Sequence, residues 1–131
     1  MPLFERTDLA LALLPGRFAI CQLQPGQPPP AAPPGAPLWS LTQTADETSL
    51  VLPEDYVEPR WRAERGYRCL VVQGPLPFSA VGVLAQLTGT LAEGNIPLFA
   101  LSTFDTDYLL VRDEHLASAL RALQDAGCRI G

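Results

Sequence analysis

The sequence predicts an α+β protein built from two tandem modules with the ferredoxin-like order βαββαβ, in which helices cover one face of an antiparallel sheet. Two observations support this prediction. The segment PLWSLTQTADETSLVLPED, from Pro37, resembles the segment PLFALSTFDTDYLLVRDE, from Pro97. In addition, strand-like and helix-like patterns surround the second segment in the order that the fold requires. A strand–turn–strand unit that occurs twice in so short a chain indicates two copies of one module.

The two segments align position by position. With one residue of the first segment's turn left out, the matched pairs are Pro37/Pro97, Leu38/Leu98, Trp39/Phe99, Leu41/Leu101, Thr42/Ser102, Leu50/Leu109, Val51/Leu110, Leu52/Val111 and Glu54/Asp113. The repeat predicts a degenerate N-terminal unit over residues 1–64 and a C-terminal domain over residues 65–131. Because modules of this size are marginally stable alone, we expect them to share a core.

In the first half, the apolar runs Leu9–Leu14 and Arg17–Leu23 flank Pro15-Gly16, which predicts a hairpin or tight turn between two strands. Residues 24–37 form a loop so rich in proline that neither a helix nor an interior strand can run through it. After the first repeat, Glu54–Glu64 reads as a short helix or turn that is interrupted by proline.

The second half begins with Tyr67–Gln73, a nearly continuous apolar run that predicts a central strand. A helix is expected from Ser79 to about Glu93, with Ser79 as its N-cap and Gly94-Asn95 as its stop. The predicted core-facing stripe of this helix is Leu84, Leu87, Thr88 and Leu91.

The second hairpin is expected over Ile96–Phe104 and Asp107–Arg112. A last helix, Asp113–Ala126, starts on acidic residues and ends before Gly127. Its apolar face consists of Leu116, Leu120 and Leu123. A short final strand over Cys128–Ile130 completes the βαββαβ order.

Composition excludes several classes of function. The 131 residues carry a net charge of −5 and no basic cluster, which argues against binding to nucleic acid or to an anionic membrane surface. The longest apolar stretch, Leu9–Pro15, is too short to span a bilayer, and Glu5 and Asp8 occupy the place of a signal peptide's positive charges. We therefore expect a cytoplasmic protein, with Cys21, Cys69 and Cys128 as reduced, buried thiols.

Catalysis finds little support in the sequence. His115 is the only histidine, so no Ser/His/Asp or Cys/His arrangement can form without it. Asp, Glu and Cys do not fall at metal-ligand spacing, and no glycine-rich phosphate loop is present. Asp105 and Asp107 form a carboxylate pair, but nothing nearby explains how the pKa of either would be raised for acid–base work. We expect no enzyme activity, no metal and no cofactor.

Two motifs carry a family resemblance. The run GVLAQLTGTLAEGNI, residues 82–96, resembles the G-x-L-x-x-L-x-x-x-L-x-x-x-x-I pattern of ACT domains, which are amino-acid-binding regulatory modules with the ferredoxin-like fold. The following STFDTDYLLV, residues 102–111, is similar to the STF-x-x-D segment of one branch of that family. This branch contains small bacterial tandem-ACT proteins and the eukaryotic CASTOR-type arginine sensors. The resemblance implies a ligand sensor and covers nearly the whole chain.

The candidate ligand site lies where the helix begins. The first backbone N–H groups of a helix have no intrahelical partner and suit the α-carboxylate of an amino acid, with Ser79 as the cap and Gly82 allowing close approach. Asp105 and Asp107 suit an ammonium group, Thr103 offers a hydroxyl and Phe104 an apolar wall. The resemblance implies the same positions, because these residues match the pocket of the CASTOR-type sensors: Gly82, Val83, Thr103, Phe104, Asp105 and Asp107.

Structural roles are the alternatives for these residues. Gly82 also suits close helix–sheet packing, the two aspartates are good turn formers, and Phe104 suits a core. The first-copy turn Thr44–Thr48 is a weaker second candidate site. The chain also departs from the CASTOR-type pattern, because Ala80 and Val81 precede the helix glycine where those sensors carry an acidic residue. A cationic ligand side chain would therefore lose one carboxylate partner.

The sequence thus predicts a sensor that binds an amino acid or a related small metabolite and reports it through its quaternary state, as a homodimer or through a regulated protein partner. The alternative is a ligand-free structural or interaction module whose exposed sheet edges pair with another chain.

Overall fold

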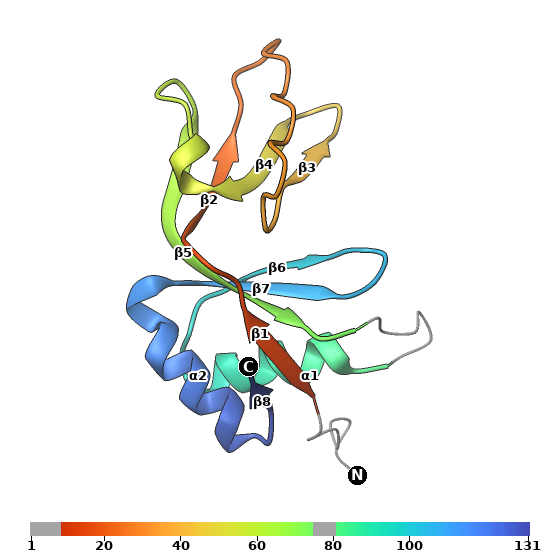
Figure 1. Cartoon of the computed structure of the whole chain (residues 1–131), viewed down its shortest axis with the longest axis vertical. Helices are drawn as coiled ribbons and strands as arrows, with labels where there is room; N and C mark the ends of the chain where they lie inside the picture. The colour runs from red at the N-terminus through yellow and green to blue at the C-terminus, as the bar shows by residue number, and fades with distance from the viewer. Residues whose placement is uncertain (1–8, 75–80) are drawn as a thin grey trace. The chain divides into compact units, whose positions relative to one another are not determined.

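The computed structural model describes residues 9–74 and 81–131, and these residues form two compact units (Figure 1). The C-terminal unit joins the described residues up to Leu14 to Arg68–Gly131, and the N-terminal unit is Pro15–Tyr67. Strand β5, Arg62–Val72, contributes its first residues to the N-terminal unit and its last residues to the C-terminal unit. None of the helices in the described ranges is long and apolar enough to cross a membrane.

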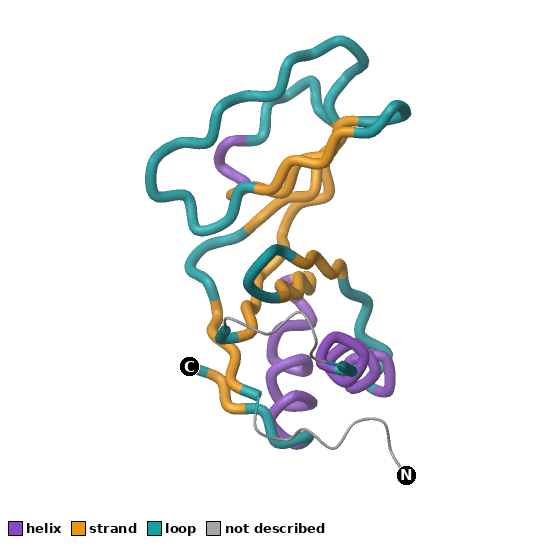
Figure 2. Tube along the Cα trace, turned by 90° about the vertical axis from the view of Figure 1, so that its right-hand side faces the viewer, coloured by secondary structure: helices purple, strands orange, loops and turns teal. Residues whose placement is uncertain are grey.

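The C-terminal unit has the predicted α+β architecture. Its elements are β1 (Ala10–Leu13), the end of β5, α1 (Val83–Glu93), β6 (Phe99–Ser102), β7 (Asp107–Arg112), the 3-10 turn η2 (Asp113–His115), α2 (Leu116–Asp125) and β8 (Arg129–Ile130). From β5 onward these elements follow the order βαββαβ, which confirms the ferredoxin-like prediction. The strands lie in the order β6–β7–β5–β1–β8, and both helices pack on the same side of them (Figure 2).

The position of β1 was not predicted. β1 runs antiparallel to β5, with Leu11 opposite Val72, and parallel to β8, with Leu11 opposite Ile130. Pro15-Gly16 separates two strands, as predicted, but the hairpin alternative is wrong, because β1 and β2 both pair with β5 rather than with each other. The physical reason is burial: Leu11 is fully buried in the core of the C-terminal unit. The first strand thus groups with the C-terminal residues, unlike the expected division at residue 64.

The N-terminal unit consists of β2 (Phe18–Gln22), β3 (Ser40–Gln43), β4 (Thr48–Pro53), the 3-10 turn η1 (Glu54–Tyr56) and the start of β5. Its strands pair antiparallel in the order β3–β4–β2–β5. This is the strand order of a βαββαβ sheet, but the proline-rich loop and η1 occupy the places of the two helices. The proline-rich loop contains neither helix nor strand, as predicted, whereas β5 already begins at Arg62, inside the predicted Glu54–Glu64 turn.

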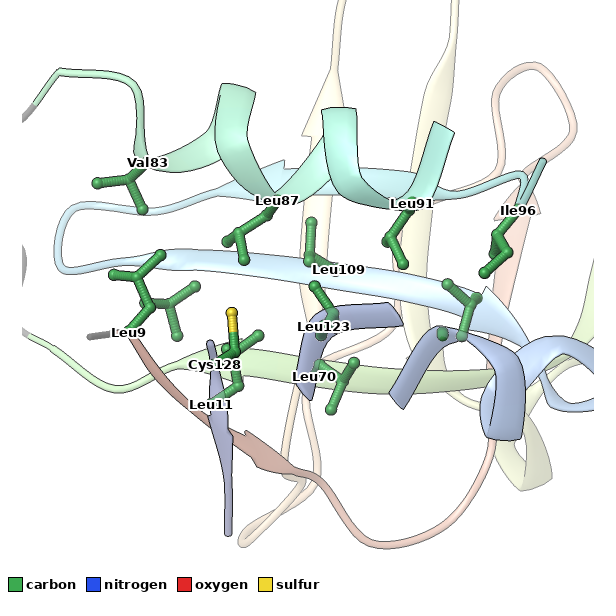
Figure 3. Packing of buried hydrophobic residues seen from close by; sticks show 13 residues of the cluster. Leu9, Leu11, Leu70, Val83, Leu87, Leu91, Ile96, Leu109, Leu123 and Cys128 are labelled. Atoms are coloured by element: carbon green, nitrogen blue, oxygen red, sulfur yellow. The ribbon is translucent and has the colours of Figure 1, made fainter. Parts of the chain in front are cut away.

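Each unit has its own apolar cluster. In the C-terminal unit, Val83, Leu87 and Leu91 project from α1 toward Leu109 of β7 and Leu70 of β5 (Figure 3). The predicted stripe is therefore right at Leu87 and Leu91, whereas Leu84 and Thr88 are only partly buried. The helix begins at Val83 and not at Ser79, which lies outside the described residues. The cluster of the N-terminal unit consists of Ala19, Cys21, Leu23, Leu50, Leu52 and Trp61.

The internal repeat is visible as two matching hairpins. β3 and β4 close with Gln43 opposite Thr48, and β6 and β7 close with Ser102 opposite Asp107, so both turns have four residues. A backbone hydrogen bond spans each turn, from Thr44 N–H to the Glu47 carbonyl at 2.9 Å and from Thr103 N–H to the Thr106 carbonyl at 2.8 Å. The sequence alignment that removed one residue from the turn is therefore wrong; the length difference lies before β3.

Candidate functional site

A shallow cavity of about 580 Å³, largely open to solvent, lies in the C-terminal unit between the end of β5 and the turn that joins β6 to β7. Its size lies within the range of small-molecule sites. Its walls combine strand ends with polar turn residues and one aromatic side chain, namely Val71, Val72, Gln73, Gly74, Asp105, Thr106 and Tyr108.

Hydrogen bonds fix the turn wall of this cavity. The Thr106 hydroxyl donates to the Val72 carbonyl oxygen at 2.6 Å and so ties the turn to the end of β5. The Thr103 hydroxyl oxygen accepts from Thr106 N–H at 3.4 Å, which adds a second link within the turn. The Ser102 hydroxyl donates to Asp107 Oδ1 at 2.6 Å. The turn is therefore a preorganised polar wall.

The predicted turn residues occupy different positions around the cavity. Asp105 lines it, and its carboxylate forms no hydrogen bond or ion pair with the rest of the described chain. Thr103 and Asp107 belong to the same turn but lie outside the lining, and their side chains bond within the hairpin. Phe104 is 78% exposed, so the alternative interpretation of this residue as part of the core is wrong.

The predicted residues at the helix start have structural roles. Gly82 is the N-cap of α1 with φ +83°, a left-handed backbone conformation that side-chain-bearing residues rarely adopt. Val83 is 5% exposed, and its side chain packs in the core of the C-terminal unit. No side chain among the described residues caps α1, and the first backbone N–H groups of the helix are donors without an intrahelical partner. Ser79 lies outside the described residues.

The sequence analysis predicted only Asp105 among the lining residues and missed the other six, namely Val71, Val72, Gln73, Gly74, Thr106 and Tyr108. Gln73-Gly74 follows the buried strand directly, and strand ends of this kind commonly supply polar groups to sites. Thr106 stands between the two predicted aspartates, but nothing in the pattern of the turn shows that its hydroxyl reaches across to β5.

The described part of the chain offers few groups for metal binding or for thiol chemistry. No group of three or more His, Cys, Asp or Glu side chains gathers there in a way that suits a metal ion. The three cysteines are unpaired and buried, as predicted. Burial raises the pKa of the Cys69 thiol to about 12 and that of Cys21 to about 11, so both are protonated at neutral pH.

Both the sequence and the fold of this chain resemble those of known proteins. Residues 62–125 match the sequence model of the ACT domain. Fifty residues are 38% identical to the human protein named cytosolic arginine sensor for mTORC1 subunit 1, and the bovine protein of that name gives the same values. The matched segment covers 38% of this chain but only 15% of the length of these sensors.

Solved structures share the fold over nearly the whole chain. The crystal structure of protein Atu0741 from Agrobacterium tumefaciens is 32% identical, with a TM-score of 0.86, and the match covers 95% of this chain and 92% of that one. The ligand-free regulatory subunit of aspartate kinase from Thermus thermophilus matches with a TM-score of 0.61 at 13% identity, over 88% of this chain and 95% of that subunit. Residues 62–125 of this chain therefore belong to the ACT domain family.

Proposed function

We propose that this protein is a regulatory sensor that binds an amino acid in the cavity between the end of β5 and the turn at residues 103–106. The observation that carries the proposal is the Asp105 carboxylate, which lines a cavity of small-molecule size without a hydrogen bond or ion pair in the described chain. An unpaired carboxylate on a fixed turn suits the ammonium group that every free amino acid carries.

The other end of the ligand requires hydrogen-bond donors. The Gln73 side-chain amide, in the cavity lining, is the donor that we propose for the α-carboxylate. In this arrangement the ligand links the turn to Gln73, directly after the end of β5. The names of the related proteins, an arginine sensor and a regulatory kinase subunit, support a regulatory role.

We further propose that ligand binding changes an association equilibrium of a cytoplasmic homodimer or of a complex with a regulated partner protein. β6 pairs only with β7 among the described strands, so its other edge can accept a strand from another chain. Phe99 on this strand is 37% exposed, and Phe104 in the adjacent turn is more exposed still. A ligand that favours one assembly shifts its population.

A thermal-shift screen against the twenty amino acids at millimolar concentration tests the binding proposal. A ligand at a hundredfold excess over its Kd adds about 2.7 kcal/mol to the free energy of unfolding, which raises the Tm by several degrees. Asp105→Asn should reduce the shift, whereas Asp55→Asn, at an exposed carboxylate of the N-terminal unit, should leave it unchanged. A panel without any shift would contradict the sensor proposal and favour the interaction module.

Mass measurement by light scattering, with and without the amino acid identified by the screen, tests the association proposal. We expect the average mass to change on binding. If the mass does not change with ligand but is lower in a Phe104→Ser variant, the free edge of β6 pairs with another chain whether or not ligand is bound.

A further inference from the structure

The N-terminal unit contains a cavity of its own, of about 510 Å³, at the end of β2. Like the first cavity, it lies between a strand end and a hairpin turn, here the turn that joins β3 to β4. The polar side chains in its lining are Gln22, Gln24, Thr44, Asp46, Glu47, Thr48 and Arg62.

The two cavities occupy corresponding places in their units. β2 and the end of β5 are the first strands of the βαββαβ order in the two units, and the turns at residues 44–47 and 103–106 have the same length and the same backbone hydrogen bond. In each unit a hydrogen bond links the strand end to the hairpin, from Leu23 N–H to the Thr48 carbonyl at 3.0 Å and from the Thr106 hydroxyl to the Val72 carbonyl. The correspondence therefore extends from the sequence repeat to the cavity walls.

The second cavity carries charges of opposite sign on opposite sides of β2. Gln22 pairs with Ser49 of β4 on one side and with Arg62 of β5 on the other, which places the two neighbouring strands roughly 10 Å apart. Arg62 Nη1 donates to Gln22 Oε1 at 3.3 Å, so its guanidinium lies over the end of β2. The turn that joins β3 to β4 supplies the carboxylates of Asp46 and Glu47.

The turn that carries these carboxylates is fixed by its own hydrogen bonds. The Thr44 hydroxyl oxygen accepts from the backbone N–H groups of Asp46 and Glu47, each at 3.1 Å. The Glu47 carboxylate accepts from the Ser49 hydroxyl, whereas the Asp46 carboxylate forms no hydrogen bond or ion pair with other described side chains. The cavity therefore offers a carboxylate on a fixed turn for a cation and a guanidinium for an anion.

We propose that this cavity is a second amino-acid site, so that each chain binds two ligand molecules. The ammonium group of the ligand lies against Asp46 and its carboxylate against Arg62, with the Gln24 amide as an additional hydrogen-bonding group. This inference rests on the proposed function for the choice of ligand class, but it depends on different residues. The second site uses an arginine side chain to bind the carboxylate, whereas none of the described residues that line the first is an arginine.

Backbone NMR spectra of the ¹⁵N-labelled full chain, titrated with each of the twenty amino acids, separate the two sites. We expect one amino acid to shift the resonances of residues 22–26, 44–48 and 62. Shifts at residues 71–74 and 103–108 report the first site independently. Shifts at the first site alone would overturn the second-site inference and leave the proposed function intact. A panel that shifts neither set would overturn both.

Two charge-removing variants test the assignment of the polar groups. Asp46→Asn and Arg62→Gln should each weaken binding at the second site by about tenfold, because each loses one charge-assisted hydrogen bond. The matched controls are Asp55→Asn and Arg60→Gln, which remove the same charges at exposed positions outside the cavity lining. Equal affinities in all four variants would refute the site, and Asp105→Asn should leave this affinity unchanged.

Discussion

The Thr106 hydroxyl donates a hydrogen bond of 2.6 Å to the backbone carbonyl oxygen of Val72, and both residues line the cavity of the C-terminal unit. This bond joins residues that are 34 positions apart in the sequence. It links the Asp105 turn to the end of β5 and so contributes to the shape of the proposed site.

Replacing Thr106 with valine should weaken ligand binding as well as stability. Valine keeps the shape of threonine but cannot donate, so the variant should lose about 1 kcal/mol of unfolding free energy and bind its amino acid more weakly. Urea unfolding and calorimetric titration measure the two effects. Thr88→Val is the control, because the Thr88 hydroxyl bonds only within α1, to the carbonyls of Leu84 and Ala85. Equal losses in both variants would show that the Thr106–Val72 bond has no special role.

Gly66 should resist substitution for a conformational reason. It has φ +80° and lies at the irregularity where β5 passes Ala19 of β2, and its N–H donates to Glu54 Oε2 at 3.1 Å. An added Cβ meets no atom within 4 Å, so the cost of Gly66→Ala is backbone strain, about 1–2 kcal/mol.

Gly89→Ala is the matched control for this prediction. Gly89 lies inside α1 without a positive φ, and a Cβ there also meets open space. Alanine should therefore stabilise the helix by about 0.5–1 kcal/mol. Thermal unfolding should show Tm changes of opposite sign in the two variants. A loss of stability in both would contradict the conformational explanation.

The C-terminal βαββαβ order could be predicted from the sequence because each of its elements has a local signal. α1 ends at Glu93 before Gly94, as predicted, because helix termination depends on neighbouring residues. The place of β1 could not be predicted in this way. Leu9–Leu14 is an equally good strand beside β2 or beside β8, and only the burial of Leu11 between β5 and β8 decides between these partners.

The candidate site was predictable only in outline. The sequence motif identified the turn that contains Asp105, because turn residues are marked by composition. It could not separate Asp105, which lines the cavity, from Asp107, whose carboxylate bonds to Ser102, because that difference depends on which face of the hairpin each side chain occupies. The same limit applies to Val83, because its position in the sequence motif does not show that its side chain is buried.

The core face of α1 can be tested by truncating two of its leucines. Leu91 is fully buried, so Leu91→Ala should cost about 2–5 kcal/mol of unfolding free energy through lost contacts and the cavity left behind. Leu84 is only partly buried, so Leu84→Ala should lower the free energy of unfolding clearly less. Denaturant midpoints of the two variants compare the costs. A larger loss at Leu84 would mean that the helix is rotated from the orientation described above.

The buried thiols predict a particular dependence on pH. Burial raises the pKa of Cys69 and Cys21 above the value of about 8.5 for an exposed thiol, to about 12 and about 11. Below the unfolded value the thiols are protonated in both states, and the full stabilisation is present. As pH rises further, the unfolded chain releases its thiol protons first, so stability falls between about pH 9 and pH 12.

Two measurements check this behaviour. At pH 8 a thiol-specific reagent such as Ellman's reagent should label the native protein slowly and label three thiols per chain at once in guanidinium chloride. In urea unfolding, a Cys69→Ala variant should show a shallower loss of stability above pH 9 than the unmodified protein. A thiol that reacts rapidly in the native protein would contradict the burial of that cysteine. An unchanged slope in the variant would mean that groups other than Cys69 determine the alkaline loss of stability.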